Sequence, residues 1–97
     1  MQRDKILSIL RQALPELRDR YGVKDLAIFG SVARDEARED SDVDVLVTYQ
    51  RPAGLLEYMG LREDLETRLG RKVDLTTPSA LKPRMKPAVE KDLVRVA

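Results

Sequence analysis

Two aspartates, Asp42 and Asp44, stand one residue apart at the start of an apolar segment, and a third, Asp74, lies inside a later one. Side chains alternate along a β-strand, so Asp42 and Asp44 are expected on one face with their Cα atoms ~7 Å apart. Asp74 lies between Val73 and Leu75, and it should therefore point away from the apolar face of its strand. If the two strands are neighbours, the three carboxylates share one side of a sheet. Such a set can hold two divalent cations ~4 Å apart, which stabilises the attacking and leaving oxygens of a phosphoryl displacement.

The chain contains no histidine and no cysteine. This absence excludes zinc fingers, Ser-His-Asp triads, cysteine nucleophiles and histidine general bases. Carboxylates are hard oxygen ligands, so the cations that suit the remaining residue types are Mg²⁺ and Mn²⁺. Because no histidine is present, Asp74 is also the candidate that accepts the proton of an attacking hydroxyl group.

A Gly-Ser turn, Gly30-Ser31, follows a short apolar run and precedes the paired aspartates. Glycine lets the backbone approach a ligand closely, and amides at the start of a helical turn favour anions. The Ser31 hydroxyl can donate a further hydrogen bond, and the planar guanidinium of Arg34 can reach a phosphate. The turn is therefore a candidate phosphate-binding element.

Each of these features also has a purely structural interpretation. In a chain so rich in aspartate, about one Asp-x-Asp pair is expected by chance. Asp42 could belong to a solvated turn, and Asp74 could serve as a cap or an ion-pair partner. Ser31 taken alone is better interpreted as a helix N-cap, and Ser41 as a turn former that steadies the strand after it. It is the joint occurrence of turn and carboxylates that favours one nucleotide site.

The elements that must position these residues follow from periodicity and from chain-breaking residues. Helical spacing predicts a helix from residue 3 to 21, broken or kinked near Leu14 by Pro15 and ended by Gly22. The other expected elements are strands over 26–29, 43–48 and 71–76, a short helix within 31–37, a polar turn at 39–41, and helices over 55–69 and 85–93. This order predicts a small α/β domain, in which helices flank a short mixed sheet.

Composition limits the number of domains and the kinds of partner and cellular location that are expected. The chain has 97 residues, of which 42% are hydrophobic and 36% charged, and its net charge is only +1. Residues 1–97 are expected to form a single domain, without a field that attracts nucleic acid or acidic membranes. No signal peptide or apolar span of ~20 residues is recognisable, so a cytoplasmic location is expected.

The C-terminal part of the chain carries a run of basic residues. We interpret this run as a solvated helix face, although docking of an acidic partner remains an alternative. The apolar stripe of the 55–69 helix is assigned to the core, and only an exposed remainder would indicate an interface. The basic residues are Lys82, Arg84, Lys86, Lys91 and Arg95.

The segments "GSVAR" and "SDVDVLV" together resemble the nucleotidyltransferase superfamily that includes polymerase β. The short length and the leading helix are similar to its minimal nucleotidyltransferases, the MNT family. The resemblance implies a nucleotidyltransferase fold and a site that binds ATP with two Mg²⁺ ions, Mn²⁺ being possible. It assigns nucleotide binding to Gly30, Ser31 and Arg34, and metal binding and catalysis to Asp42, Asp44 and Asp74. Family members commonly have glycine where this chain has Asp35, whose charge would repel a triphosphate if it pointed inward.

MNT proteins are similar to the antitoxins of two-gene systems whose toxin is a HEPN-domain ribonuclease. The resemblance implies transfer of AMP from ATP to a tyrosine hydroxyl of that toxin, with no membrane partner and no direct contact with nucleic acid. A second hypothesis is a non-catalytic antitoxin that neutralises the toxin by binding it. A third is transfer to a small molecule, which is less favoured because no segment is recognisable that would enclose one.

Overall fold

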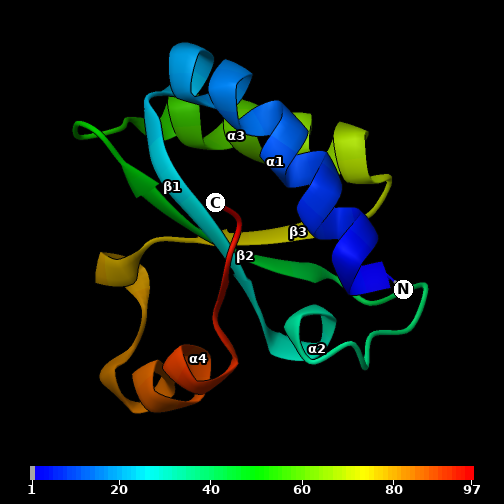
Figure 1. Ribbon diagram of the computed structural model, residues 1–97. Helices are drawn as coiled ribbons and strands as arrows, with labels where there is room; N and C mark the ends of the chain where they lie inside the picture. The colour runs from blue at the N-terminus through cyan, green and yellow to red at the C-terminus, as the bar shows by residue number, and fades with distance from the viewer. Residues whose placement is uncertain (1) are drawn as a thin grey trace.

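The computed structural model describes residues 2–97 as a four-stranded mixed sheet with helices on both sides (Figure 1). Within these residues, no helix combines the length and the apolar character needed to cross a membrane. The elements are α1 (Gln2–Tyr21), β1 (Val23–Phe29), α2 (Gly30–Ala33), β2 (Val43–Tyr49), α3 (Leu55–Leu69), β3 (Val73–Thr76), the 3₁₀ turns η1 (Pro78–Ala80) and η2 (Pro83–Met85), α4 (Lys86–Asp92) and β4 (Val94–Arg95).

The strand order is β3-β2-β1-β4. β1 runs antiparallel to both β2 and β4, whereas β2 and β3 are parallel and are connected through α3. In this register Phe29 of β1 pairs with Asp44 of β2, and Asp44 pairs with Asp74 of β3. Residues that pair across a sheet point to the same face, so these three side chains form one row.

The opposite face of the sheet is apolar and packs against α1 and α3, as Figure 1 shows. Alternation places Val43, Val45 and Val47 of β2 on this face, and all three are fully buried. The predicted alternation of β2 is therefore confirmed. The core is completed by residues of α1, α3 and β3 that include Leu10, Leu14, Leu17, Leu61, Leu65, Val73 and Leu75.

Asp44 and Asp74, which we call the aspartate row, lie on a face of the sheet that is covered only in part. Ala27 and Phe29 of β1 point to this side and are buried, as is Val89 of α4, which packs near β1. α4 therefore covers the β1 side of this face, while Asp44 is half-buried and Asp74 is exposed.

The prediction that Pro15 breaks the first helix is wrong. α1 continues through Pro15 as one helix of 20 residues. Pro15 is exposed, while Leu14 and Leu17 beside it are buried against the sheet. Packing of the flanking turns thus outweighs the hydrogen bond that proline cannot donate. The predicted stop at Gly22 is confirmed: its φ of 70° is left-handed, and its N–H donates to the carbonyl of Arg18.

Other boundaries differ in detail from the predictions. The helix over 55–69 is confirmed at both ends, and the turn at 39–41 is present. The short helix within 31–37 is instead the four-residue α2, the third strand begins only at Val73, and the last helix begins at Lys86. The sequence analysis missed β4, which pairs with Ala27 and Ile28 through two residues only.

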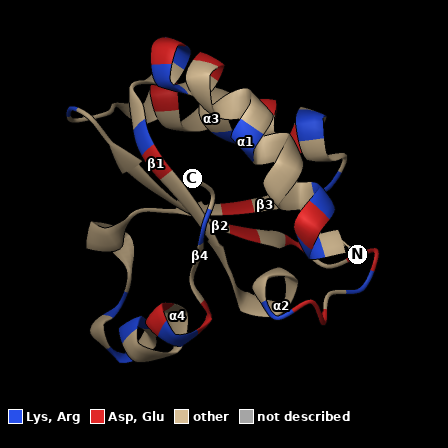
Figure 2. Ribbon diagram, in the orientation of Figure 1, with Lys and Arg blue, Asp and Glu red and all other residues tan. Residues whose placement is uncertain are grey.

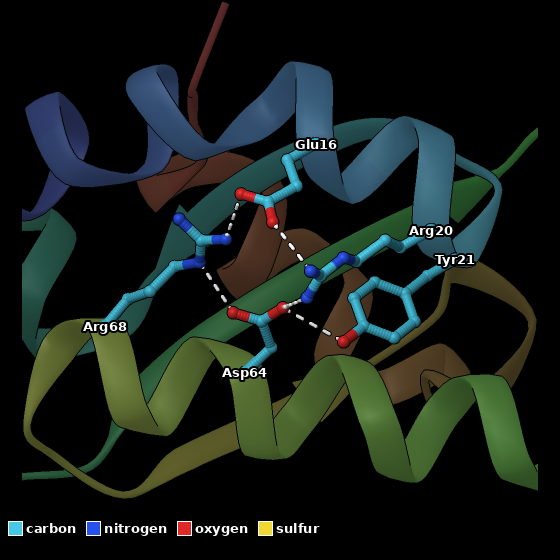
Figure 3. Close-up of polar contacts among 5 residues, drawn as sticks. All are labelled: Glu16, Arg20, Tyr21, Asp64 and Arg68. Carbon is cyan, nitrogen blue, oxygen red and sulfur yellow. Dashed lines mark hydrogen bonds and ion pairs between the residues drawn. The ribbon is translucent and has the colours of Figure 1, made fainter.

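Charged side chains join α1 to α3 outside the apolar core, as Figure 3 shows. The Asp64 carboxylate accepts hydrogen bonds from Arg68 Nε at 2.6 Å and from the Tyr21 hydroxyl at 2.9 Å. Glu16 pairs with Arg68 at 2.6 Å and with Arg20 at 3.2 Å. Each carboxylate of this cluster thus has a donor within reach.

Candidate active site

Asp44 and Asp74 lie directly beside each other on the parallel strands β2 and β3. Figure 2 shows the acidic segments of these two strands next to each other in the sheet. The chain reaches this arrangement because Val43 and Val45 on one strand, and Val73 on the other, are held in the core on the opposite face. The sequence prediction that Asp44 and Asp74 share one side of the sheet is confirmed.

Gly30 brings the backbone into direct contact with Asp44. It follows Phe29, the residue that pairs with Asp44, and its φ is 72°. A Cβ atom at Gly30 would lie 2.2 Å from Asp44 Oδ2, which no side chain could tolerate without a shift. Glycine is therefore required here for two reasons, the left-handed backbone and the position of the carboxylate.

The environment of Asp44 disfavours its charged form. Burial above all, together with repulsion from Asp74 and Asp42, raises the pKa of Asp44 from 3.8 to about 6, and Arg34 offsets only part of this rise. Within residues 2–97, no hydrogen bond or ion pair to the Asp44 carboxylate offsets this cost. A cation placed between the carboxylates would relieve both burial and repulsion.

Asp42 lies just before β2 and is exposed. The turn that precedes it is held by two hydrogen bonds between Arg38 and Ser41, including one from the Arg38 N–H to Ser41 Oγ at 2.9 Å. Arg71 donates to the carbonyl oxygens of both residues, and its bond to Ser41 is 2.8 Å. The predicted role of Ser41 as a turn former is confirmed, whereas Arg71 as an anchor was not foreseen.

Across the described part of the chain, no three carboxylates lie close enough together to form a ready-made metal site. Asp42 influences Asp44 through its charge but does not line the cavity described below. A cation site made of all three carboxylates would therefore require a movement of the turn that carries Asp42.

A cavity of about 590 Å³ opens above the aspartate row. Its sheet wall is formed by Phe29, Gly30, Asp44, Asp74 and Thr76. The C-terminal part of the chain forms the opposite wall, which includes Lys82, Arg84, Met85, Ala88 and Val89. This volume lies in the range of sites that enclose small molecules and cofactors.

Arg34 lines the cavity, but its guanidinium is already engaged. Arg34 Nη1 lies 2.6 Å from Asp92 Oδ2 of α4, and Arg34 Nε lies 3.2 Å from Glu36 Oε2. The hydrogen bonds that Arg34 donates to Asp92 and Glu36 raise its pKa above the usual value. A phosphate would have to compete with Asp92 for this side chain.

The N-cap interpretation of Ser31 is wrong. α2 begins at Gly30, its N-cap is Phe29, and no side chain caps it. The tight turn after β1 starts the helix two residues earlier than a serine cap at position 31 would. Ser31 is half-buried but does not line the cavity, so a contact with nucleotide from Ser31 remains a prediction.

Asp35, the position where the resemblance leads us to expect glycine, occupies a left-handed backbone conformation that glycine adopts without strain. Its φ of 60° is left-handed, a region that aspartate tolerates better than most residues. Asp35 Oδ1 accepts a hydrogen bond from the Arg3 N–H of α1 at 3.4 Å, and Asp35 does not line the cavity. Asp35 therefore does not point into the cavity, and in this conformation its charge does not repel a triphosphate bound there.

The prediction that Lys82 and Arg84 lie on a solvated helix face together with the later basic residues is wrong. Both precede α4, in the segment that contains η1 and η2, and both line the cavity. Pro78 and Pro83 each begin a 3₁₀ turn, and these turns lead the chain back across the sheet. Two prolines so close together were the available signal that no continuous helix forms here.

The sheet, the aspartate row and the glycine turn together define a nucleotidyltransferase-type domain. Residues 10–96 match the nucleotidyltransferase domain family, to which the chain therefore belongs. It is 44% identical over 93 residues to protein adenylyltransferase MntA of Thermococcus cleftensis, covering 96% of this chain and 94% of that one.

Solved structures place the chain among the minimal nucleotidyltransferases. One structure described as a minimal nucleotidyltransferase is 38% identical, with a TM-score of 0.79, covering 97% of this chain and 95% of that one. The fold also matches a structure described as tri-AMPylated Shewanella oneidensis HEPN toxin in complex with MNT antitoxin. This match has a TM-score of 0.65 at 17% identity and covers 94% of this chain and 71% of that chain.

Proposed function

We propose that this chain is an antitoxin-type protein adenylyltransferase, which transfers AMP from Mg-ATP to a tyrosine hydroxyl group of a HEPN-domain toxin. The observation that carries the proposal is the in-register pair Asp44 and Asp74, which lies in a cavity of nucleotide size beside Gly30 and, within residues 2–97, forms no hydrogen bond or ion pair with a basic side chain. The name of the 44% identical relative and the HEPN complex of the structural neighbour support it.

The donor set fits Mg²⁺. Asp44 and Asp74 offer only carboxylate oxygens, and the raised pKa of Asp44 marks a position where negative charge lacks compensation. Asp42 would complete the set after a movement of its turn. Two bound Mg²⁺ ions, or Mn²⁺ in their place, would neutralise the charge that develops on the transferred phosphate.

The reaction balances with ATP and the acceptor alone. The acceptor oxygen forms a bond to the α-phosphorus, the bond from that phosphorus to the bridging oxygen breaks, and pyrophosphate leaves with the electron pair. The hydroxyl proton passes to the Asp74 carboxylate, which is exposed and can release it to water. Gly30 keeps the neighbouring Asp44 carboxylate in position.

A protein acceptor agrees with the surface of the molecule. Leu55 and Leu56 at the start of α3 are 71% and 84% exposed, and Met59 one turn later is 42% exposed. They form the exposed apolar remainder of this helix that is typical of an interface. Met85 in the opposite wall of the cavity is also exposed, so an apolar side chain borders the proposed site.

The test is intact-mass spectrometry of the protein encoded by the neighbouring gene, which the proposal takes to be a HEPN-domain toxin, after co-expression with the wild type or with an Asp42→Asn, Asp44→Asn double variant. We expect AMP mass increments on the toxin with the wild type only. An unmodified toxin held in a stable complex by both versions would instead establish an antitoxin that acts by binding, and would disprove the enzymatic proposal. The engagement of Arg34 by Asp92 is the observation that favours this alternative.

A further inference from the structure

The cavity has two walls of opposite charge. Asp44 and Asp74 lie on the sheet wall, while Lys82 and Arg84 lie on the opposite wall. The third pair of charges in the cavity, Arg34 and Asp92, is neutralised internally at 2.6 Å. The uncompensated charges are thus acidic on one side and basic on the other.

Lys82 and Arg84 belong to residues 78–85, which we call the strap and which contain η1 and η2. Both side chains are exposed, and within residues 2–97 neither has an ion-pair partner or a side-chain hydrogen bond. Arg68 and Arg95, by contrast, each have a carboxylate within 3.3 Å. The charges of the strap are available to a ligand without breaking an existing contact.

We propose that Lys82 and Arg84 bind the leaving pyrophosphate part of the nucleotide, an inference that rests on the proposed function. The reacting α-phosphate must lie at the carboxylates of the sheet wall. The remaining two phosphates then extend across the cavity toward the strap, where two cations compensate their charge. Arg34 adds to this binding only after it leaves Asp92.

The test compares two double variants of equal charge. Lys82→Ala with Arg84→Ala removes the strap cations, and Lys86→Ala with Lys91→Ala removes two cations of α4 that do not line the cavity. Binding of Mg-ATP, Mg-pyrophosphate and AMP is measured by isothermal titration calorimetry, and folding is checked by circular dichroism. We expect the strap variant to bind Mg-ATP and Mg-pyrophosphate roughly 10- to 100-fold more weakly, because hydrogen bonds to charged groups are the strong ones.

AMP affinity should stay within about twofold of the wild type in both double variants, since AMP lacks the two terminal phosphates. The α4 variant should bind all three ligands like the wild type. If both double variants lost Mg-ATP affinity equally, the loss would be due to the lower net positive charge of the protein, and the inference would be overturned. Unchanged Mg-ATP affinity in the strap variant would overturn it while leaving the proposed function intact, even if transfer to the toxin were slower. Failure of the wild type to bind Mg-ATP would overturn both.

Discussion

Two partly buried aspartates of this molecule, Asp64 and Asp44, have opposite electrostatic surroundings. Asp64, whose side chain is 13% exposed, receives hydrogen bonds from Arg68 and Tyr21 and lies 3.8 Å from Arg20 (Figure 3). Asp44 instead is repelled by Asp74 and Asp42, with Arg34 offsetting only part of this, and burial together with the repulsion raises its pKa to about 6. The negative charge of Asp64 is thus stabilised by its neighbours, whereas the negative charge of Asp44 is destabilised by burial and repulsion.

This difference separates structural charge from functional charge. The cluster around Asp64 joins α1 to α3, and it needs nothing from outside the chain. The row that contains Asp44 carries an electrostatic cost in its ionised form that a bound cation would relieve, which is typical of functional sites. Substitutions in the two regions should therefore affect different properties.

The largest expected effect comes from Asp44→Asn, which removes a charge but keeps the shape. We expect AMP transfer to fall about a thousandfold, as loss of a metal-binding carboxylate removes several kcal/mol of transition-state stabilisation. Thermal stability at pH 8 should not decrease, because a costly charge is removed. Transfer is measured by intact mass and stability by circular dichroism.

Asp64→Asn is the matched control for this comparison. It should lower the free energy of unfolding by about 1–3 kcal/mol, since Arg68 loses a charged partner. Transfer at temperatures well below the melting point should be unchanged. If Asp64→Asn abolished transfer in a folded protein, or Asp44→Asn retained full activity, the division into structural and functional charge would be wrong.

Gly30→Ala tests whether the position of the Asp44 carboxylate matters as much as its charge. The new Cβ would lie 2.2 Å from Asp44 Oδ2 and would displace it. Displacement by about 1 Å can reduce catalysis roughly 10²-fold, and we expect a loss of that order. The measurement is the rate of AMP incorporation into the toxin at saturating Mg-ATP.

Gly70→Ala provides the control, because Gly70 also has a left-handed φ, of 66°, but has nothing within 4 Å of an added Cβ. Both variants should lose about 1–2 kcal/mol of stability from backbone strain. Only Gly30→Ala should lose transfer, and a similar loss in Gly70→Ala would assign the effect to strain alone.

The pH dependence should run in opposite directions for stability and for cation binding. The pKa of Asp44 is raised on folding, so its contribution to stability is complete below pH 3.8 and is lost as pH rises through about 6. Binding of Mg²⁺ or Mn²⁺ needs the ionised form and should weaken about tenfold per pH unit below pH 6. Calorimetric titration with Mn²⁺ between pH 4.5 and 8 checks this, and Asp44→Asn should remove the dependence. A flat binding profile of the wild type would contradict the assignment of Asp44 as a ligand.

Local patterns were sufficient to predict most of the elements and the aspartate row. The valines of β2 alternate with Asp44, and the flanking residues of Asp74 are apolar, so the two carboxylates had to share a face once the strands were neighbours. The ends of α3 followed from Gly54 and Gly70, of which Gly70 adopts the expected left-handed conformation.

Contacts between distant parts of the chain could not be predicted in this way. The bond from Arg34 to Asp92 spans 58 residues, and β4 is too short to show a period. The position of Lys82 and Arg84 depends on how two 3₁₀ turns direct the strap, which is decided by packing of α4 on β1. The continuity of α1 at Pro15 has the same origin, because tertiary packing overrides local propensity.

Asp92→Asn tests the ion pair between Arg34 and Asp92, which combines features of the structural and of the functional charges. Arg34 lines the cavity with the functional carboxylates, yet it is paired like a residue of the Asp64 cluster. Removing the charge of Asp92 should release Arg34 to a phosphate and strengthen Mg-ATP binding a few-fold, a small effect because exposed ion pairs are weak. Calorimetry with Mg-ATP measures the change, with Glu90→Gln, an exposed carboxylate of the same helix, as the control. Weaker binding in Asp92→Asn would mean that the pair orients Arg34 for the nucleotide, so that Arg34 would act from its present position.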